Sequence, residues 1–104
     1  MPSSVLDFPF DWVHLIASTQ VASARCMLHS VTINSPATGA SSVALHDVAA
    51  VGDILPANMI ANITLNPALF VVPATLIYDC QCVNGLYVLF SAGITTEDIT
   101  VSYR

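Results

Sequence analysis

The chain has 104 residues, a length typical of one domain. Only 9% of the residues are charged, against about 25% in an average globular protein, and the net charge is −5. Lysine is absent and arginine occurs only twice, so the chain lacks the clustered cations that bind nucleic acid phosphates. This composition excludes a nucleic acid partner.

So few charges leave a surface made largely of Ser, Thr, Asn, Ala and some apolar side chains. Large exposed apolar patches usually mark contact sites between proteins. We therefore predict a homo-oligomer whose surface is partly covered by other subunits. A soluble monomer with a polar β surface is the alternative.

A membrane span is the main rival explanation for the apolar composition. Residues 54–78 carry no charged side chain and are long enough to cross a bilayer. However, Pro56, Pro67 and Pro73 interrupt the segment, and proline in a helix interior costs about 3 kcal/mol. We interpret the segment as buried strands and turns, and we expect no membrane partner. The N-terminus lacks the basic region of a signal peptide, so we expect no export by the secretory route.

The first 20 residues show no sustained periodicity and are predicted to form an extended N-terminal arm, although residues 10–16 also fit a first strand. Phe8, Phe10 and Trp12 alternate and would share one face of an extended segment. Aromatic side chains of this kind are typical interface anchors. We predict that these three residues contact a neighbouring subunit, and that deleting residues 1–13 leaves the fold intact.

Residues 21–104 are predicted to form seven or eight short strands. Within residues 24–34, alternation places Met27, His29, Val31 and Ile33 on one face, together with Arg25. The opposite face would carry Cys26, Leu28, Ser30 and Thr32. Further strands are predicted at 42–48, 59–65, 68–82, 85–91 and 98–104.

This spacing indicates an all-β fold, a single-domain antiparallel β-sandwich or jelly roll with an arm at 1–20 and the sandwich at 21–104. Asn84-Gly85 is a strong signal for a tight hairpin. We also predict that residues 98–104 pair with residues 85–91 in a closing hairpin, with Ile99, Val101 and Tyr103 toward the core. The predicted core is Leu28, Val43, Leu45, Ile63, Leu86, Val88, Phe90, Ile99 and Val101.

No catalytic or cofactor-binding motif occurs in the sequence. His14, His29 and His46 with Cys80, Cys82 and Asp47 contain the side-chain types of a zinc site, but their spacing fits none of the common patterns. No nucleophile signature supports a catalytic triad. We therefore expect no enzymatic activity, no cofactor and no metal site.

The order of segments carries a family resemblance. A Pro-bearing N-terminal segment leads into CMLHSVTIN, followed by PATGASS and VALHD, and later by NGLYVLFSAG and a terminal ITVSYR. This pattern, over about residues 24–104, resembles the small virion structural proteins of tailed bacteriophages. It contains strands and turns but no catalytic motif.

The resemblance implies a non-enzymatic β-sandwich protein that is made in the cytoplasm of a host bacterium and built into a virion. Within this class we expect a capsid cement or decoration protein on the capsid surface. Its expected partners are the major capsid protein and copies of itself, arranged as a homotrimer.

Two alternatives remain open at the level of sequence. The first is a tail, neck or fibre-adaptor component of the same kind of particle. The second is a carbohydrate- or receptor-binding β-sandwich, in which Trp12, Tyr78, Tyr87 and Tyr103 would form a sugar platform.

Overall fold

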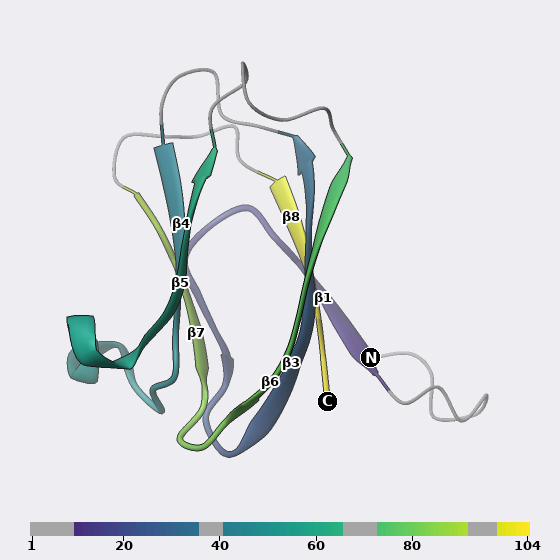
Figure 1. Cartoon of the computed structure of the whole chain (residues 1–104). Helices are drawn as coiled ribbons and strands as arrows, with labels where there is room; N and C mark the ends of the chain where they lie inside the picture. The colour runs from purple at the N-terminus through teal and green to yellow at the C-terminus, as the bar shows by residue number, and fades with distance from the viewer. Residues whose placement is uncertain (1–9, 36–40, 66–72, 92–97) are drawn as a thin grey trace.

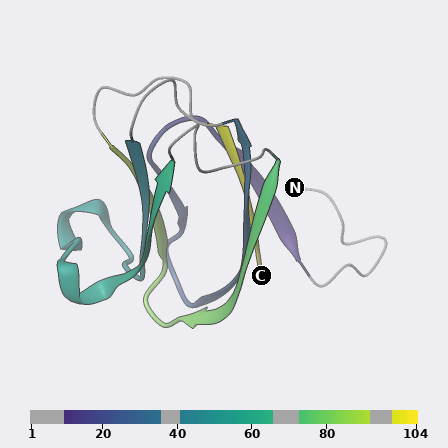
Figure 2. The same ribbon diagram turned by 45° about the horizontal axis from the view of Figure 1, so that its top comes forward.

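The computed structural model describes residues 10–35, 41–65, 73–91 and 98–104. Eight strands form two antiparallel four-stranded sheets that face each other (Figures 1 and 2). The described residues contain no α-helix, only two short 3-10 turns. The prediction of an all-β antiparallel sandwich is therefore confirmed.

Sheet A has the strand order β1-β8-β3-β6 and sheet B the order β2-β7-β4-β5. The strands of sheet A are β1 (Asp11–Leu15), β8 (Asp98–Tyr103), β3 (Cys26–Ser35) and β6 (Ala74–Cys82). Those of sheet B are β2 (Thr19–Ala22), β7 (Leu86–Phe90), β4 (Ser41–His46) and β5 (Met59–Leu65). The 3-10 turns η2 (Val51–Asp53) and η3 (Pro56–Asn58) lie between β4 and β5.

The core lies between the inner faces of the two sheets, as expected when alternating apolar residues of each strand are turned inward. Eight of the nine predicted core residues are buried, and the ninth, Phe90, is half-buried and packs against them. The buried cluster is Leu15, Cys26, Leu28, Val31, Ile33, Val43, Leu45, Ile63, Cys82, Leu86, Val88, Ile99 and Val101.

Strand β3 departs from the predicted alternation because it contains a bulge. Its register shifts between Leu28 and Ser30 against both neighbouring strands. Leu28 faces the core before the shift, whereas Val31 faces it afterwards. The predicted grouping of Val31 with Met27 on one face is wrong, because one extra residue at a bulge moves all later side chains to the opposite face.

The Asn84-Gly85 turn does not close a hairpin within a sheet. It connects β6 of sheet A to β7 of sheet B, and these strands do not pair. A Cβ atom on Gly85 would lie 2.5 Å from the carbonyl oxygen of Val48 and 2.6 Å from that of Ala22. The glycine is therefore needed because three backbone segments meet there, and not because of a hairpin turn.

The predicted closing hairpin is also wrong. Strand β8 lies between β1 and β3 in sheet A, opposite the sheet that contains β7. The predicted faces of β8 are nevertheless correct, since Ile99 and Val101 are fully buried and Tyr103 packs against the core. The strand does lie inside a sheet, with different partners.

Residues 11–20 differ from the predicted extended arm. Strand β1 pairs with β8 along its whole length, and Leu15 belongs to the core. Strand β2 pairs with β7 in the other sheet. The boundary predicted at residue 20 is therefore not a boundary of the described fold, and residues 1–9 lie outside the described residues.

Substituting Gly85 with alanine tests the backbone crossing. We expect Gly85→Ala to lower the free energy of unfolding by more than about 1 kcal/mol, because the added methyl group would collide with two carbonyl groups. Gly52→Ala is the control, since nothing lies within 4 Å of a Cβ atom at Gly52. Urea unfolding followed by circular dichroism measures both variants. Equal stability of the two would contradict the crossing described here.

Deleting residues 1–15 tests whether β1 belongs to the domain. We expect a markedly lower melting temperature, because the deletion removes Leu15 from the core and leaves one side of β8 unpaired. A deletion of residues 1–9 is the control, since it keeps every described contact. If both truncated proteins melt at the same temperature as the full chain, β1 contributes nothing to stability.

Candidate interaction surfaces

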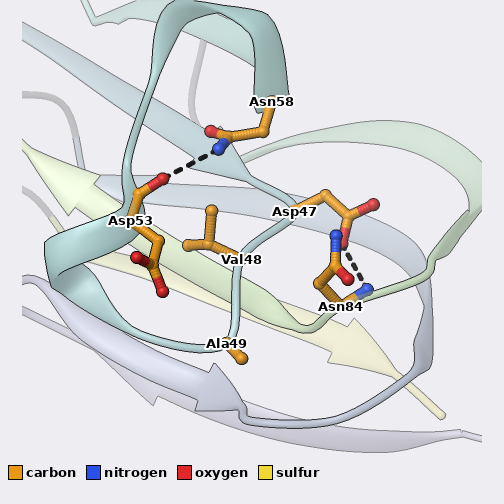
Figure 3. A pocket seen from close by; sticks show the side chains of 6 residues that line it. All are labelled: Asp47, Val48, Ala49, Asp53, Asn58 and Asn84. Atoms are coloured by element: carbon orange, nitrogen blue, oxygen red, sulfur yellow. Dashed lines mark hydrogen bonds between the residues drawn. The ribbon is translucent and has the colours of Figure 1, made fainter.

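The Asp47 carboxylate fixes the position at which the chain crosses between the sheets. Its Oδ2 accepts a hydrogen bond from the backbone N–H of Val83 at 3.0 Å. Its Oδ1 accepts a bond from the N–H of Asn84 at 2.7 Å (Figure 3) and another from the N–H of Gly85 at 3.2 Å. Asp47 follows β4 directly, so one side chain ties the end of sheet B to the connection that leaves sheet A.

The side chain of Gln20 also connects backbone segments at this crossing. The Gln20 side-chain amide donates hydrogen bonds to the carbonyl oxygens of Ala22, Val48 and Leu86 at 2.7, 2.8 and 3.2 Å. It thereby joins β2, β7 and the segment after β4. Hydrogen bonds of this kind satisfy partly buried backbone groups that have no partner in a sheet.

Asn58 holds the segment between β4 and β5 in shape. Its Oδ1 accepts hydrogen bonds from the Nδ1 of His46 at 2.9 Å and from the backbone N–H of Leu55 at 3.1 Å. Its Nδ2 donates to the carbonyl oxygen of Asp53 at 2.9 Å (Figure 3). His46 is only 2% exposed, so the hydrogen bonds of Asn58 connect this segment to a buried side chain of sheet B.

The segment held in this way presents apolar side chains to solvent. We name residues 51–59 the 51–59 projection, because they extend from the sandwich on the side away from sheet A (Figure 1). Val51, Leu55 and Met59 are 58%, 59% and 41% exposed. Beside them lies a hollow of about 270 Å³ lined by Asp47, Val48, Ala49, Asp53, Asn58 and Asn84.

The predicted interface aromatics have different surroundings. Phe8 lies outside the described residues. Phe10 stacks on His29 of its own chain, with ring centroids 4.1 Å apart and an interplanar angle of 12°. His29 in turn contacts the carboxylate of Asp79. Trp12 is half-exposed on the outer face of sheet A, so of the predicted residues described here it is the more available to a partner.

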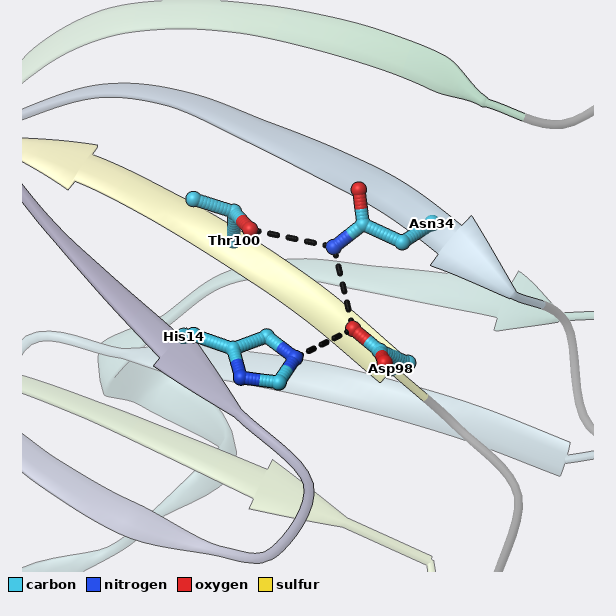
Figure 4. A network of polar contacts seen from close by, with 4 residues as sticks. All are labelled: His14, Asn34, Asp98 and Thr100. Atoms are coloured by element: carbon cyan, nitrogen blue, oxygen red, sulfur yellow. Dashed lines mark hydrogen bonds and ion pairs between the residues drawn. The ribbon is translucent and has the colours of Figure 1, made fainter.

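A polar network covers one end of the outer face of sheet A. Nε2 of His14 lies 2.6 Å from Oδ1 of Asp98, and Nδ2 of Asn34 donates to Asp98 and Thr100 at 3.0 Å each (Figure 4). The bond from Asn34 and the contact with His14 hold the pKa of the Asp98 carboxyl below its ordinary value. The network is therefore formed at neutral pH and weakens as the pH falls through this pKa.

The two arginines of the chain line a single hollow. Arg25, Cys26, Met27, Gln81 and Arg104 surround a space of about 370 Å³ at the end of sheet A. Hydrogen bonds of 3.0 and 2.9 Å between the backbones of Met27 and Arg104 bring the two arginines to this place. Among the described residues the ion pairs join histidines to aspartates, and neither arginine takes part in one.

Three free thiols lie on the core side of the same end of sheet A. Cys26 and Cys82 are buried and Cys80 is half-buried. Burial raises the pKa of the Cys82 thiol to about 12, and burial also raises the pKa of Cys26. Both thiols are therefore protonated at neutral pH and react slowly as nucleophiles.

The residues considered for a zinc site lie in separate places. His14 and His29 are on the outer face of sheet A, where each contacts an aspartate, and His46 is bonded to Asn58 in sheet B. Cys80 and Cys82 face the interior, and the Asp47 carboxylate is occupied by backbone N–H groups. Within the described ranges, no three His, Cys, Asp or Glu side chains are close enough to hold a metal ion.

The four aromatics considered for a sugar platform do not form one surface. Tyr78 and Tyr103 pack against the core, and burial raises the pKa of both hydroxyl groups. Trp12 lies in β1 of sheet A and Tyr87 in β7 of sheet B. Since Trp12 is on an outer face of the sandwich and two of the tyrosines are turned inward, the platform is not assembled.

No protein-family model, curated protein or solved structure matches this chain. In the part of the chain that the structure describes, no helix has the length and apolar character needed to span a bilayer. The case for a function therefore rests on the exposed surfaces and on the resemblance stated from the sequence.

Replacing Asp47 tests the anchor of the crossing between the sheets. We expect Asp47→Ala to lower the free energy of unfolding by about 2 to 3 kcal/mol, because hydrogen bonds to a charged group are lost and three backbone N–H groups lose their acceptor. Asp53→Ala is the matched control: the side chain is exposed, so a change within about 0.5 kcal/mol is expected. Thermal melts of both variants measure the effect. If Asp47→Ala melts at the same temperature as the original protein, the Asp47 carboxylate does not anchor the crossing.

Proposed function

We propose that this chain is a non-enzymatic structural protein of a bacteriophage virion, a capsid cement or decoration protein that binds the major capsid protein. The observation that supports this best is the 51–59 projection, which presents three exposed apolar side chains from a backbone held by hydrogen bonds. The assignment to a virion comes from the sequence resemblance, and the structure supports the role in binding.

The projection is suited to protein binding for two physical reasons. Burying apolar surface is favourable by about 25 cal/mol per Å². The hydrogen bonds of the Asn58 side chain, together with the backbone bond from the Asp47 N–H to the carbonyl oxygen of Asn58, already order the segment, so little conformational entropy is lost when a partner binds. The side chains of Val51, Leu55 and Met59 carry no charge that would have to be desolvated.

The arrangement of polar side chains also favours a structural role over a catalytic one. A histidine that activates a nucleophile must be within hydrogen-bond reach of a hydroxyl or thiol group. The hydrogen bonds that the structure gives to the side chains of His14, His29 and His46, among described residues, go to Asp98, Asp79 and Asn58. In each of these contacts the histidine partner is a carboxylate or an amide and not a hydroxyl or thiol group, which supports a structural role.

Self-association into a homotrimer is part of the proposal, as is assembly in the cytoplasm of the host bacterium. The low charge and the exposed Trp12 and Ile77 on the outer face of sheet A support contacts between copies. A tail, neck or fibre-adaptor role would use the same kind of surface and differs in where the chain sits and in how many copies a particle carries.

Quantitative mass spectrometry of purified particles tests the proposal. We expect a copy number comparable to that of the major capsid protein, and immunogold labelling over the head. In a particle assembled with Leu55→Ser, the copy number should fall strongly. Ile16→Ser is the control, since Ile16 is 67% exposed, lies between β1 and β2, and belongs neither to the 51–59 projection nor to the outer face of sheet A that is proposed to contact other copies.

Three outcomes would contradict this proposal. Absence of the chain from particles would exclude a virion role. Labelling confined to tails, with a copy number matching tail symmetry, would favour the tail component. Normal incorporation of Leu55→Ser, with the variant still folded by circular dichroism, would show that the 51–59 projection is not the binding surface.

A further inference from the structure

Two buried cysteines face each other across neighbouring strands of sheet A. Cys26 of β3 and Cys82 of β6 are register partners, and both belong to the core cluster. Opposed residues in antiparallel strands have Cα atoms about 4.5 to 5.5 Å apart, within the range of about 4.4 to 6.8 Å that a disulfide spans. A bond between them therefore requires little movement of the strands.

Of the two cysteines, Cys26 is the one next to a hollow. Cys26 is 7% exposed and is one of the residues that line the hollow together with Arg25 and Arg104, whereas Cys82 is fully buried and is not among the lining residues. The hollow contains both cationic side chains of a chain whose net charge is −5. Unpaired guanidinium groups attract carboxylates and orient them through paired hydrogen bonds. The hollow is thus the place on this acidic protein best suited to a small anion.

We propose that the Arg25–Arg104 hollow admits small anionic disulfides, of the class of oxidised glutathione, which convert Cys26 and Cys82 into an intramolecular disulfide. This site is independent of the capsid role proposed above, because it requires neither the 51–59 projection nor a partner protein.

The reaction balances as two thiol–disulfide exchanges. Cys26 loses its proton to water, and its Sγ attacks one sulfur of the bound disulfide. The S–S bond of the reagent breaks and one thiolate leaves, taking up a proton. Cys82 then loses its proton, and its Sγ attacks the Sγ of Cys26 and expels the second thiolate. The two cysteines are oxidised by two electrons, and the reagent is reduced to two thiols.

The position of Cys82 makes it the second thiol and Cys80 a bystander. Cys80 is opposite Leu28 in the register, two pairs further along β3, and is not among the residues that line the hollow. Because Cys26 and Cys82 are buried and protonated at neutral pH, a reagent that is not held near Cys26 reacts slowly. Retention of an anion by the two arginines raises the local concentration of the reagent, so the rate depends on its charge.

The test compares the reaction of the reduced, full-length protein with two disulfides that differ in charge. Oxidised glutathione is anionic, and bis(2-hydroxyethyl) disulfide is neutral. We expect a product lighter by two hydrogen atoms, with the peptides of Cys26 and Cys82 linked in a non-reducing digest. At low ionic strength, Arg25→Gln with Arg104→Gln should slow the reaction with oxidised glutathione about tenfold and leave the reaction with the neutral reagent unchanged.

Cysteine variants assign the order of the two exchanges. Cys82→Ala, or Cys82→Ser if the first does not fold, should accumulate a mixed disulfide with glutathione on Cys26. Cys80→Ala should form the Cys26–Cys82 bond at the normal rate. A mixed disulfide on Cys80, a Cys26–Cys80 bond, no oxidation of the folded protein, or equal slowing of both reagents by the arginine substitutions would each overturn the proposal.

Discussion

The fold depends on the three hydrogen bonds that the Asp47 carboxylate accepts from the backbone of residues 83–85. The chain changes sheets at this point, and no ladder partner is available to its N–H groups there. A carboxylate can accept all three at once, which a neutral side chain cannot do as well. Gly85 completes the arrangement because only a residue without Cβ fits between the carbonyl groups of Val48 and Ala22.

The two surfaces of interest lie on either side of this crossing. The 51–59 projection follows Asp47 in the chain, and its shape depends on the backbone bond from the Asp47 N–H to the carbonyl oxygen of Asn58 at 2.9 Å. Cys82 directly precedes the backbone that Asp47 binds. A change that loosens the crossing would therefore disturb both the exposed apolar side chains and the register of the opposed thiols.

Local pattern was sufficient to predict the strands after residue 20 and the core faces of β4, β5, β7 and β8, but not which strands pair. Ile99 and Val101 alternate with polar residues in the same way whether β8 lies beside β7 or opposite it, so the sequence could not separate these two arrangements. The bulge in β3 is likewise a shift of register against β6 and β8, two strands that lie far away in the sequence.

The candidate surfaces were harder to predict than the strands. Asp47 was considered only as a metal ligand, because its bonds reach residues more than 30 positions away and leave no local signal. Phe10 and Trp12 were predicted as anchors from alternation alone, and that pattern cannot show that Phe10 stacks on His29. The pairing of Arg25 with Arg104 at one hollow also follows from strand register, through Met27.

The order of strands in sheet A has a consequence for how the protein folds during synthesis. Strand β1 is the first of the eight to leave the ribosome and β8 the last, yet they pair with each other. Strand β3 likewise lacks one of its two neighbouring strands until β8 has been made. Sheet A is therefore completed only after nearly all of the described chain has been made. Pairings this distant in sequence slow folding and prolong the exposure of apolar strands, so the newly made chain is at greatest risk of aggregation before β8 is inserted.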